Sequence, residues 1–339
     1  MEQVANHLGV SRSTVCRVMN GAPGVKESTR QRVLKAMADL GYRPRGGRLG
    51  LESGRMIALV AGEISNPTHS EIAQAVEDVT STLGGTLILC NTGDSPEKEA
   101  RYVDLLIRRQ VDGIVFISVR TDSGPTLEKV SAAGIPFIIC GRMFEDRRYD
   151  LVAVDFEMGA YLATSHLAQL GHRRIGYVSG SSYIACSNER LKGYRKALEE
   201  FGIEYSEDLT VEGFYTQIGA YRAALQLLSR ESRPTAVFAA NDLMALGVLQ
   251  AAHELGLRVP EDLAVVGFDD IPIASLFCIE LTTIQHPMYE LGALTARLLM
   301  EKIERGPDQP WNPQRIILPP KLVIRRTCGA SMGGLRKAM

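Results

Sequence analysis

Apolar residues at the start of the chain recur with a helical period in two short blocks. Their members are Val4, Ala5 and Leu8 in the first block and Val15, Val18 and Met19 in the second. Gly9 lies between the blocks, where a tight turn often needs a positive φ. Ser11 follows, and its side-chain oxygen can accept an orphan backbone N–H as an N-cap. The pattern predicts two short helices joined by a glycine turn.

A third helix is predicted from Ser28 to Leu40, because apolar residues keep helical spacing there and Gly41 can end the helix. Residues 45–55 are rich in glycine and arginine and predict a linker. The pattern therefore separates a small helical head from the rest of the chain.

From Met56 onward, short β-branched runs alternate with amphipathic helical segments. The predicted strands are 56–61, 86–90, 113–118, 136–140, 151–155, 175–179, 235–240 and 263–268. The predicted helices are 71–83, 96–109, 157–170, 188–201, 219–229, 242–255 and 288–305. Continuous apolar strands between helices indicate parallel sheets covered on both faces. A stretch of about 270 residues exceeds what one such sheet usually holds. We predict an α-helical head followed by an α/β core of two doubly wound parallel-sheet lobes.

Charge is distributed unevenly along the 339 residues, whose formal net charge is −1. The chain up to Arg55 holds ten Lys/Arg against four Asp/Glu, a charge of +6, so the remainder carries −7. A basic head on an acidic body is typical of a DNA-binding domain joined to a sensor. The six cysteines are scattered without a Cys-x-x-Cys pair, and neither a signal peptide nor a membrane-length apolar run is visible. We expect a cytoplasmic protein with no metal site and no membrane partner.

The second predicted helix carries side chains that can contact DNA. Its N-terminal half and outward face hold Arg12, Ser13, Thr14 and Arg17. In a helix-turn-helix this part enters the major groove. Arginine is the commonest donor to guanine O6 and N7, so Arg17 is expected to read base edges. The alternative is a solvated helix face that makes phosphate contacts only.

Polar residues directly after predicted strands mark a second candidate site, since ligands of doubly wound sheets lie at the carboxyl ends of the strands. These residues are Asn66, Asp155, Asn241, Asp242, Asp269 and Asp270.

The sequence resembles the LacI/GalR family of bacterial transcription regulators over almost its whole length. The first motifs that carry the resemblance are Gly9-Val-Ser11, Thr14-Val15, Arg17-Val-Met-Asn-Gly21, Leu40-Gly-Tyr-Arg-Pro44, Ile64-Ser-Asn-Pro67 and Val111-Asp-Gly-Ile114. The later ones are Leu170-Gly-His-Arg-Arg-Ile-Gly176, Glu189-Arg-Leu-Lys-Gly-Tyr194, Ala239-Ala-Asn-Asp-Leu-Met-Ala245, Val259-Pro-Glu-Asp262, Val265-Val-Gly-Phe-Asp-Asp-Ile-Pro272 and Leu281-Thr-Thr283. Each motif is weak alone, whereas their shared order and spacing are specific.

The resemblance implies a helix-turn-helix domain at residues 1–44, a hinge at 45–55, a two-lobed effector-binding and dimerisation core at 56–330, and a tail at 329–339. In the core, which resembles periplasmic binding proteins, it places about 56–157 and 288–318 in the first lobe and about 158–287 and 319–328 in the second. It further implies a homodimer, or a tetramer, that reads palindromic double-stranded operator DNA. A repressor is the expected activity, with operator affinity controlled by a small effector between the lobes.

The DNA-contacting positions that the resemblance assigns are Ser11, Arg12, Ser13, Thr14, Arg17, Asn20 and Leu51. Leu51 aligns with a family leucine that wedges into the minor groove, and Leu49 is its rival. Gly46, Gly47 and Gly50 each cost about 1 kcal/mol against alanine in a helix. We therefore expect a weak hinge helix; a flexible tether without DNA contact is the alternative.

The effector-binding positions that the resemblance assigns are Thr68, His69, Asp155, Arg190, Tyr215, Asn241, Asp269, Asp270 and His286. Arg190 is the expected clamp, because its planar fork suits a carboxylate, a phosphate or vicinal hydroxyls. A surface salt bridge is the alternative for Arg190, and a core position is the alternative for Tyr215. Asp269 and Asp270 cannot both be assigned, since one can instead hold backbone N–H groups of the following turn. Carboxylates combined with asparagine and arginine favour a sugar or a sugar derivative.

Three departures from the family pattern bear on the effector. Thr68-His69 stands where relatives often have two aromatic residues, Phe156 replaces an asparagine, and His286 stands where relatives commonly carry glutamine.

The competing interpretation is a nucleotide- or NAD-dependent α/β enzyme. Residues 46–50, Gly-Gly-Arg-Leu-Gly, are not a G-x-G-x-x-G motif and follow no strand, and the sequence has no Walker motif. It also has no Ser-His-Asp arrangement or metal cluster at telling spacing. We therefore expect a regulator that has no cofactor and no enzymatic activity.

Overall fold

The computed structural model describes residues 2–19, 24–40, 54–117, 120, 122–141, 146–182, 184–306 and 309–330. Asn20, Leu49, Leu51 and the three glycines of the predicted hinge lie outside the described residues, so the predictions about them stay predictions.

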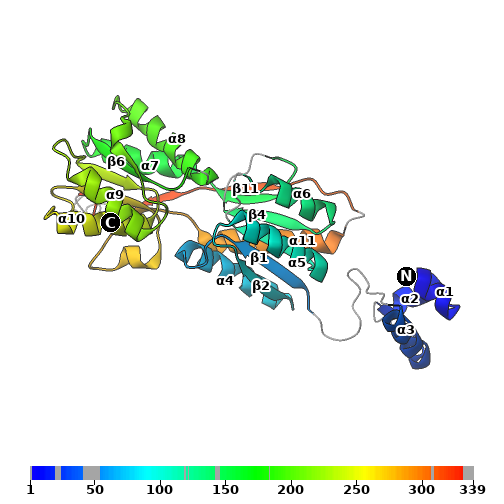
Figure 1. Cartoon of the computed structure of the whole chain (residues 1–339). Helices are drawn as coiled ribbons and strands as arrows, with labels where there is room; N and C mark the ends of the chain where they lie inside the picture. The colour runs from blue at the N-terminus through cyan, green and yellow to red at the C-terminus, as the bar shows by residue number, and fades with distance from the viewer. Residues whose placement is uncertain are drawn as a thin grey trace, which may run out of the picture.

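Three helices form the head: α1 (Glu2–Leu8), α2 (Arg12–Met19) and α3 (Glu27–Asp39) (Figure 1). Gly9 adopts a φ of 64° in the turn between α1 and α2, as a residue without Cβ can do at no steric cost. Ser11 Oγ accepts the backbone N–H of Thr14 at 3.1 Å and caps α2. The three helices share a small core of Val4, Ala5, Val15, Val18, Val33, Ala36 and Met37. The apolar stripes of the sequence are therefore the faces that pack together.

The first lobe is built on a six-stranded parallel sheet with strand order β11-β5-β4-β3-β1-β2. Its strands are β1 (Met56–Ala61), β2 (Thr86–Asn91), β3 (Gly113–Ile117), β4 (Phe137–Gly141), β5 (Leu151–Val154) and β11 (Arg315–Leu318). Its helices are α4 (Pro67–Thr82), α5 (Pro96–Arg109), α6 (Gly124–Ala132) and α11 (Met288–Arg305). Alternate residues of β1 contribute to two different hydrophobic clusters, one shared with α4 and α11 and one shared with α5 and α6. Helices therefore cover both faces of the sheet.

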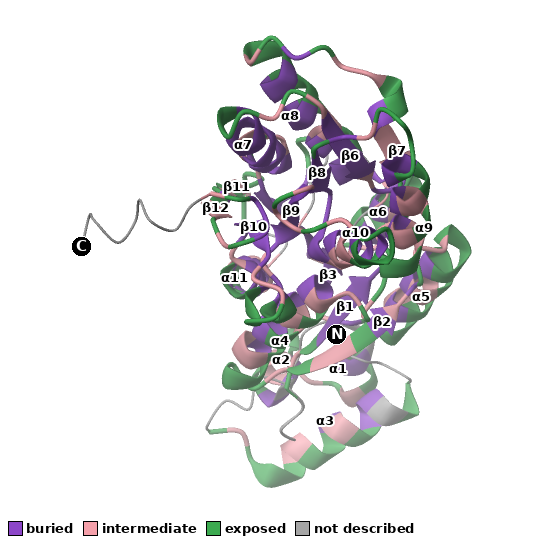
Figure 2. Ribbon diagram, turned by 90° about the vertical axis from the view of Figure 1, so that its left-hand side faces the viewer, coloured by how far each residue is buried: buried purple, intermediate pink, exposed green. Residues whose placement is uncertain are grey.

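The second lobe is built on a six-stranded sheet with strand order β12-β10-β9-β8-β6-β7. Its strands are β6 (Ile175–Ser179), β7 (Thr210–Glu212), β8 (Ala236–Ala239), β9 (Ala264–Asp269), β10 (Thr282–Gln285) and β12 (Lys321–Val323). Only β12 is antiparallel to its neighbour among the strands of the described chain. The helices are α7 (Phe156–Gln169), α8 (Ala185–Glu200), α9 (Gln217–Leu228) and α10 (Asp242–Glu254), with 3-10 turns η1 (Glu207–Leu209) and η2 (Pro272–Ser275). Figure 2 shows burial concentrated in the strands and the inward sides of these helices.

The described chain passes between the lobes three times: between β5 and α7, between β10 and α11, and between β11 and β12. The last helix of the first lobe, α11, therefore begins next to the second lobe, directly after His286 and Pro287. Near its other end, Glu304 Oε1 accepts a hydrogen bond from Arg55 Nη1 at 3.1 Å, where the chain enters the first sheet.

The predicted architecture, a helical head and two parallel-sheet lobes, is confirmed. Four strands and one helix of the structure are absent from the prediction: β7, β10, β11, β12 and α6. Three of these strands, β7, β11 and β12, lie at sheet edges and keep no buried residue, and each has only three or four residues, so the apolar runs that they carry are short. Across the described residues, no helix has both the length and the apolar character that a membrane span requires.

Candidate functional site

Four polar side chains meet at the carboxyl ends of adjacent strands in the second lobe. Asp269 ends β9, Asn241 follows β8 and His286 follows β10, while Arg190 reaches the same edge from α8. Parallel pairing of β8, β9 and β10 brings these strand ends side by side. The sheet topology therefore brings residues that are far apart in the sequence into one cluster.

Arg190 is the buried cation of this cluster, with only 4% of its surface exposed. Its guanidinium carbon lies 4.2 Å from the ring centre of Phe268 and 4.5 Å from that of Phe156. Such stacking leaves the guanidinium edge available for hydrogen bonds. Nη1 donates to Tyr215 Oη at 3.2 Å and contacts Cys186 Sγ at the same distance.

The Asp269 carboxylate balances this cation. Its Oδ1 lies 3.7 Å from Arg190 Nη2 and 3.1 Å from His286 Nε2, and all three side chains are more than nine-tenths buried. Asp269 has a φ of 121°, a conformation that L-residues rarely adopt and that is often found at functional sites. Buried charges usually occur paired in this way, since an isolated one is costly to desolvate.

Asn241 and Asp242 form the start of α10 beneath the cluster. Asn241 Oδ1 caps the helix by accepting the Met244 backbone N–H at 2.8 Å. Asp242 accepts from the Thr283 hydroxyl and from the Ile271 backbone N–H. Burial, and then the nearby Asp269, raise the pKa of Asp242 well above its ordinary value, which favours the uncharged acid.

Tyr215 closes one side of the cluster. It follows β7 with a φ of 58°, and its hydroxyl lies 2.6 Å from Ser187 Oγ. A Cβ at Gly180 would lie 2.0 Å from the Tyr215 ring, so only glycine at the end of β6 permits this placement. Burial raises the pKa of the Tyr215 hydroxyl, which therefore stays protonated and able to donate.

Four buried polar atoms of the region have no hydrogen-bond partner among the described residues. They are Arg190 Nε, Asn241 Nδ2, His286 Nδ1 and Tyr177 Oη. Buried polar groups are nearly always paired in folded proteins, so these atoms are donors and acceptors that a molecule bound in the cluster could pair.

The remaining predicted effector residues have other partners. Asp155 caps α7 by accepting the Met158 N–H at 2.8 Å. Asp270 receives hydrogen bonds from Arg325 at 2.7 Å and from Gln285 at 3.0 Å, so both of its oxygens are occupied. In the first lobe, Thr68 donates to Asn66 Oδ1, and His69 Nδ1 lies 2.8 Å from the Glu63 carbonyl. Both Thr68 and His69 are buried at the start of α4.

Four residues that line the cluster escaped the sequence prediction: Tyr177, Cys186, Ser187 and Phe268. Phe268 and Tyr177 lie inside apolar strands, where an aromatic residue normally belongs to the hydrophobic core, so the sequence did not indicate a role in the site. The departure at Phe156 was a usable signal, because its ring now packs on Arg190 and lies edge-on to His286 at 6.0 Å.

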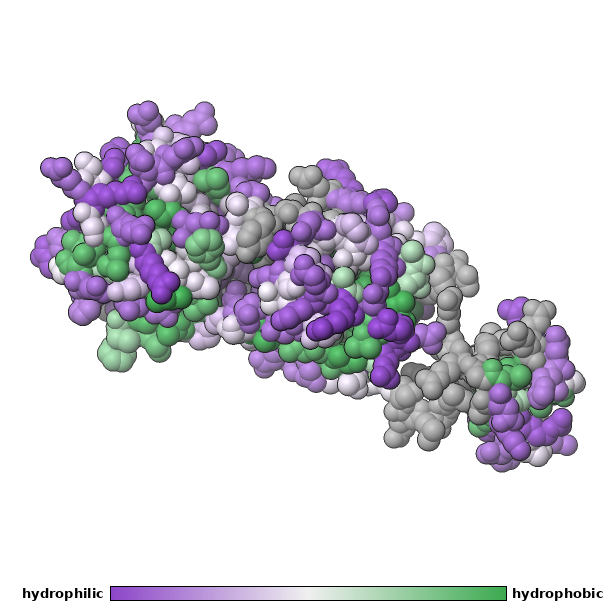
Figure 3. Space-filling view, in the orientation of Figure 1, coloured by the Kyte–Doolittle hydropathy of each residue, from purple (hydrophilic) through white to green (hydrophobic). Residues whose placement is uncertain are grey.

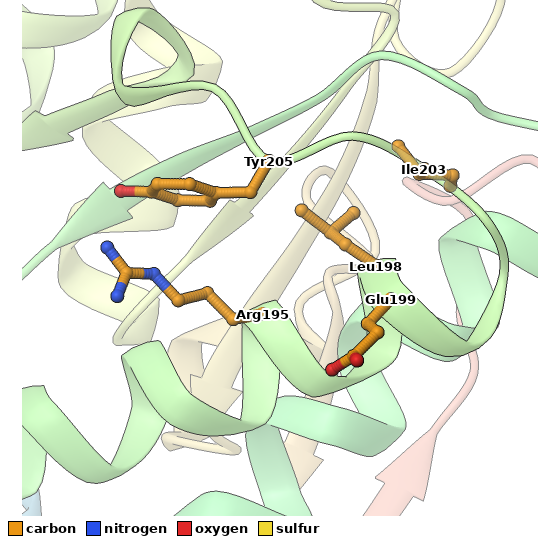
Figure 4. Close-up of a pocket in the computed structure, with 5 residues that line it drawn as sticks. All are labelled: Arg195, Leu198, Glu199, Ile203 and Tyr205. Carbon is orange, nitrogen blue, oxygen red and sulfur yellow. The ribbon is translucent and has the colours of Figure 1, made fainter.

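A shallow hollow on the outer face of α8 is separate from this cluster. Figure 4 shows its lining of Arg195, Leu198, Glu199, Ile203 and Tyr205. The Arg195 guanidinium stacks 4.2 Å above the Tyr205 ring. Arg190 and Arg195 lie about 140° apart around the helix, so one points inward and the other outward.

In the head, the predicted DNA-contacting side chains lie on the open side of α2. Ser11, Arg12, Ser13 and Arg17 are exposed, and Thr14 is half-buried. Ser11 is occupied as the helix cap and also contacts the hydroxyls of Ser13 and Thr14 at 2.8 Å. The arginines are therefore the longest exposed donors on this surface.

Residues 1–45 match the family described as bacterial regulatory proteins, lacI family. The HTH-type transcriptional regulator DegA of Bacillus subtilis is 36% identical, over 96% of this chain and 96% of the relative. The chain belongs to the LacI family. Residues 164–328 of this LacI-family chain also match a periplasmic binding protein-like domain.

Solved structures show the same architecture. The transcriptional regulator CelR in its cellobiose complex is 34% identical, with a TM-score of 0.74 over 96% of this chain and 98% of that one. The lac repressor dimer bound to operator and the anti-inducer ONPF is 28% identical, with a TM-score of 0.73 over 96% of this chain and 97% of that one. The LacI-family chain is therefore a helix-turn-helix transcriptional regulator, as the sequence predicted, and its relatives are regulators rather than enzymes.

Proposed function

We propose that this LacI-family regulator is a repressor whose operator affinity is controlled by a sugar or sugar derivative bound at Arg190, Asn241, Asp269, His286 and Tyr215. The observation that carries the proposal is the buried Arg190, whose guanidinium lies over the adjacent rings of Phe156 and Phe268 and whose Nε–H has no partner among the described residues. A sugar offers vicinal hydroxyls to such a group and apolar ring faces to the aromatic side chains. CelR, a relative with the same architecture, is a cellobiose complex.

The two lobes are joined by three chain connections, and we propose that they close around the ligand by bending at these connections. The proposed ligand contacts named above all belong to the second lobe. Thr68 and His69 of the first lobe lie in the first turn of α4, and we propose that they meet the ligand on closure. A ligand shifts the arrangement of the lobes only if it binds one arrangement better than the other. We propose that closure moves the first lobe, which carries the hinge, and so changes the spacing of two heads.

For operator recognition we propose base contacts from Arg12, Ser13 and Arg17. Ser11 and Asn20 are proposed to contact the DNA backbone, Thr14 to lie at the same DNA-facing surface, and Leu51 to lie at the operator centre. A palindromic operator requires two heads, and the lac repressor structure is a dimer on operator.

The loop after β9 exposes apolar side chains suited to such an assembly: Phe277 is 88% exposed and Leu276 is 48% exposed. Figure 3 shows hydrophobic residues gathered along the lower edge of the lobes. We propose a homodimer acting in the cytoplasm, where operator DNA is found.

The experiment combines a thermal-shift screen of sugars and metabolites with operator binding by fluorescence anisotropy. A ligand that binds the folded state raises its stability by RT ln(1 + [L]/Kd). We expect at least one sugar to raise the melting temperature and to change operator affinity without being consumed. Stabilising compounds that leave operator affinity unchanged, or that are turned over, would contradict the proposal.

A further inference from the structure

Helix α5 of the first lobe carries a basic stripe, which consists of Lys98, Arg101, Arg108 and Arg109. All four side chains are exposed, and at 3.6 residues per turn they fall within about 100° of the helix circumference. Leu105, which is 40% exposed, lies in the middle of the stripe. None of the four cations forms an ion pair with a residue that the structure describes.

The carboxyl groups of α5 do not neutralise the basic stripe. Asp104 is paired with Lys129 of α6. Glu99 is buried on the opposite face of α5, where burial raises its pKa and favours the uncharged acid. The remaining acid, Glu97, lies in the first turn and accepts a hydrogen bond from Ser95 Oγ at 2.7 Å. The stripe therefore keeps a net positive charge on a body that is otherwise acidic.

The hollow on the outer face of α8 in the second lobe has an apolar floor. Leu198 and Ile203 are buried beneath it, and the Tyr205 ring lines it beside them (Figure 4). Its volume is about 440 Å³. An apolar side chain from another surface can be buried there, as in the central pocket of a protein–protein interface.

An acidic rim, which consists of Glu199, Glu204 and Glu207, accompanies this hollow. Residues 195–208 hold five Asp/Glu against two Lys/Arg, a charge of −3. The three rim carboxylates are exposed, and none forms an ion pair within the part of the chain that the structure describes. Cationic side chains of a partner would therefore find unpaired carboxylates on this surface.

The two surfaces are complementary in charge and in form. One presents an exposed leucine among cations, and the other presents an apolar hollow among carboxylates. They lie on different lobes of the chain (Figure 1). DNA phosphates would also match the cations, but they would not account for Leu105 or for the acidic hollow.

We propose that the basic stripe of one copy binds the acidic rim of a second copy, with Leu105 entering the hollow. A contact between two different surfaces is heterologous and can join more than two copies, so the protein forms assemblies larger than the proposed dimer. Neither surface includes the exposed loop at Phe277 or the cluster around Arg190. The contact is therefore independent of the proposed effector.

Sedimentation velocity of the full-length protein at several protein concentrations tests the contact. The screening length of salt falls from about 10 Å at about 0.1 M to about 3 Å at about 1 M. We expect assemblies larger than a dimer at the lower salt concentration and their loss at the higher one. Assemblies that persist at the higher salt concentration, or a mass that never exceeds the dimer, would overturn the proposal.

Charge reversal identifies the two surfaces. Arg101→Glu with Arg108→Glu reverses the basic stripe, and Glu204→Lys with Glu207→Lys reverses the acidic rim. In either variant alone, like charges face each other, so we expect association to weaken by at least about tenfold. An equimolar mixture of the two variants restores opposite charges at every contact, and its association should return toward that of the parent protein. A mixture that stays dissociated contradicts the pairing.

The matched control is Arg297→Glu with Lys321→Glu, which reverses two exposed cations outside both surfaces. Arg297 is on α11, which covers the other face of the first sheet, and Lys321 is on β12, at the sheet edge away from β7. This variant should associate like the parent protein. Operator binding by each variant reports that it is folded; where a reversed variant fails to bind operator, the salt dependence of the parent protein decides.

DNA is the other occupant that the basic stripe could take. If reversal of the stripe weakens binding to non-specific DNA and leaves the sedimenting mass unchanged, the stripe contacts phosphates and the proposal is overturned.

Discussion

A guanidinium taken out of water costs free energy unless its charge and its N–H groups find partners. Arg190 meets part of this cost through Asp269, Tyr215 and the aromatic faces of Phe156 and Phe268, yet its Nε–H has no partner in the part of the chain that the structure describes. An unpaired Nε–H suits Arg190 to bind a ligand, because a hydrogen bond from the ligand to this donor would offset the free-energy cost of burying it.

Arg190→Lys should abolish the effector response and leave operator binding without effector unchanged. Lysine keeps the positive charge but lacks the planar fork and the Nε–H. We expect effector affinity to fall by at least about tenfold, which corresponds to about 1.4 kcal/mol. Calorimetry and anisotropy measure the two properties. Arg195→Lys on the outer face of α8 is the control and should respond normally; a normal response in Arg190→Lys would remove this residue from the site.

Glu189 should make the stability of the protein depend on pH. Burial raises its pKa to about 7, so the folded state holds a proton that the unfolded state releases near pH 4.5. The stability that this proton provides is full below the unfolded value and is lost as the pH rises through about 7. Glu189→Gln should therefore raise the free energy of unfolding by about 1–3 kcal/mol at pH 8 and by little at pH 4.5. Urea denaturation at both values measures this, and an equal gain at both would contradict the assignment.

Arg17→Ala should lower discrimination among operator sequences by about 1–3 kcal/mol while effector binding stays intact. A base-reading arginine changes sequence preference, whereas a phosphate contact weakens all sequences alike. Binding to a panel of single-base operator variants at fixed salt measures the difference. Arg32→Ala, an exposed arginine on α3, is the control and should leave the preference unchanged. An unaltered sequence preference in Arg17→Ala would show that the Arg17 side chain contacts the DNA phosphates and not the base edges.

At the scale of elements, the site depends on how tightly α7 and α8 pack. A Cβ at Gly193 would lie 2.0 Å from the Glu157 carbonyl oxygen, and one at Gly159 would lie 2.6 Å from the Phe268 ring. The two glycines therefore permit the close helix contact and seat the aromatic ring on which Arg190 stacks. Changes here should act on the site through backbone spacing.

Gly193→Ala should destabilise the protein by about 1–3 kcal/mol, the usual cost of overpacking, and weaken effector binding. Gly124→Ala at the start of α6 is the matched control, since its Cβ would meet no atom within 4 Å. That control should stay within about 0.5 kcal/mol of the parent protein. Urea unfolding of both variants tests the comparison. Equal stability of the two variants would show that α7 and α8 can separate without cost.

The elements also show what the sequence could predict. Helices α5 and α11 and strands β1 and β6 have the same first and last residues as the apolar pattern predicted. The edge strand β11 has an apolar run of only three residues next to two prolines, which is too short to distinguish a strand from a loop. In the site, the motifs of the resemblance indicated Arg190 and Asp269. No local pattern reveals that Arg325, 55 positions away, occupies Asp270.

At the scale of the whole molecule, the exposed loop after β9 bears on assembly. Phe277→Asn should shift a dimer toward monomer, because it removes the most exposed large apolar side chain recorded in the described chain. Sedimentation equilibrium at several concentrations measures the change. Leu170→Asn at the end of α7 is the control, with 39% exposure, and should keep the parent mass. An unchanged mass in Phe277→Asn would place the interface elsewhere.

Helix α11 links distant parts of the molecule mechanically. It starts two residues after His286. Near its other end, Glu304 accepts a hydrogen bond from Arg55, the residue directly before β1. Eighteen residues make a rod about 27 Å long. A tilt of about 5° at its first turn sweeps its far end through about 2 Å, given that length. Because α11 packs on α4 and on the first sheet, the helix and its lobe would turn together. The length of α11 would convert a small turn beside the second lobe into a larger displacement at Arg55, where the chain enters the first lobe.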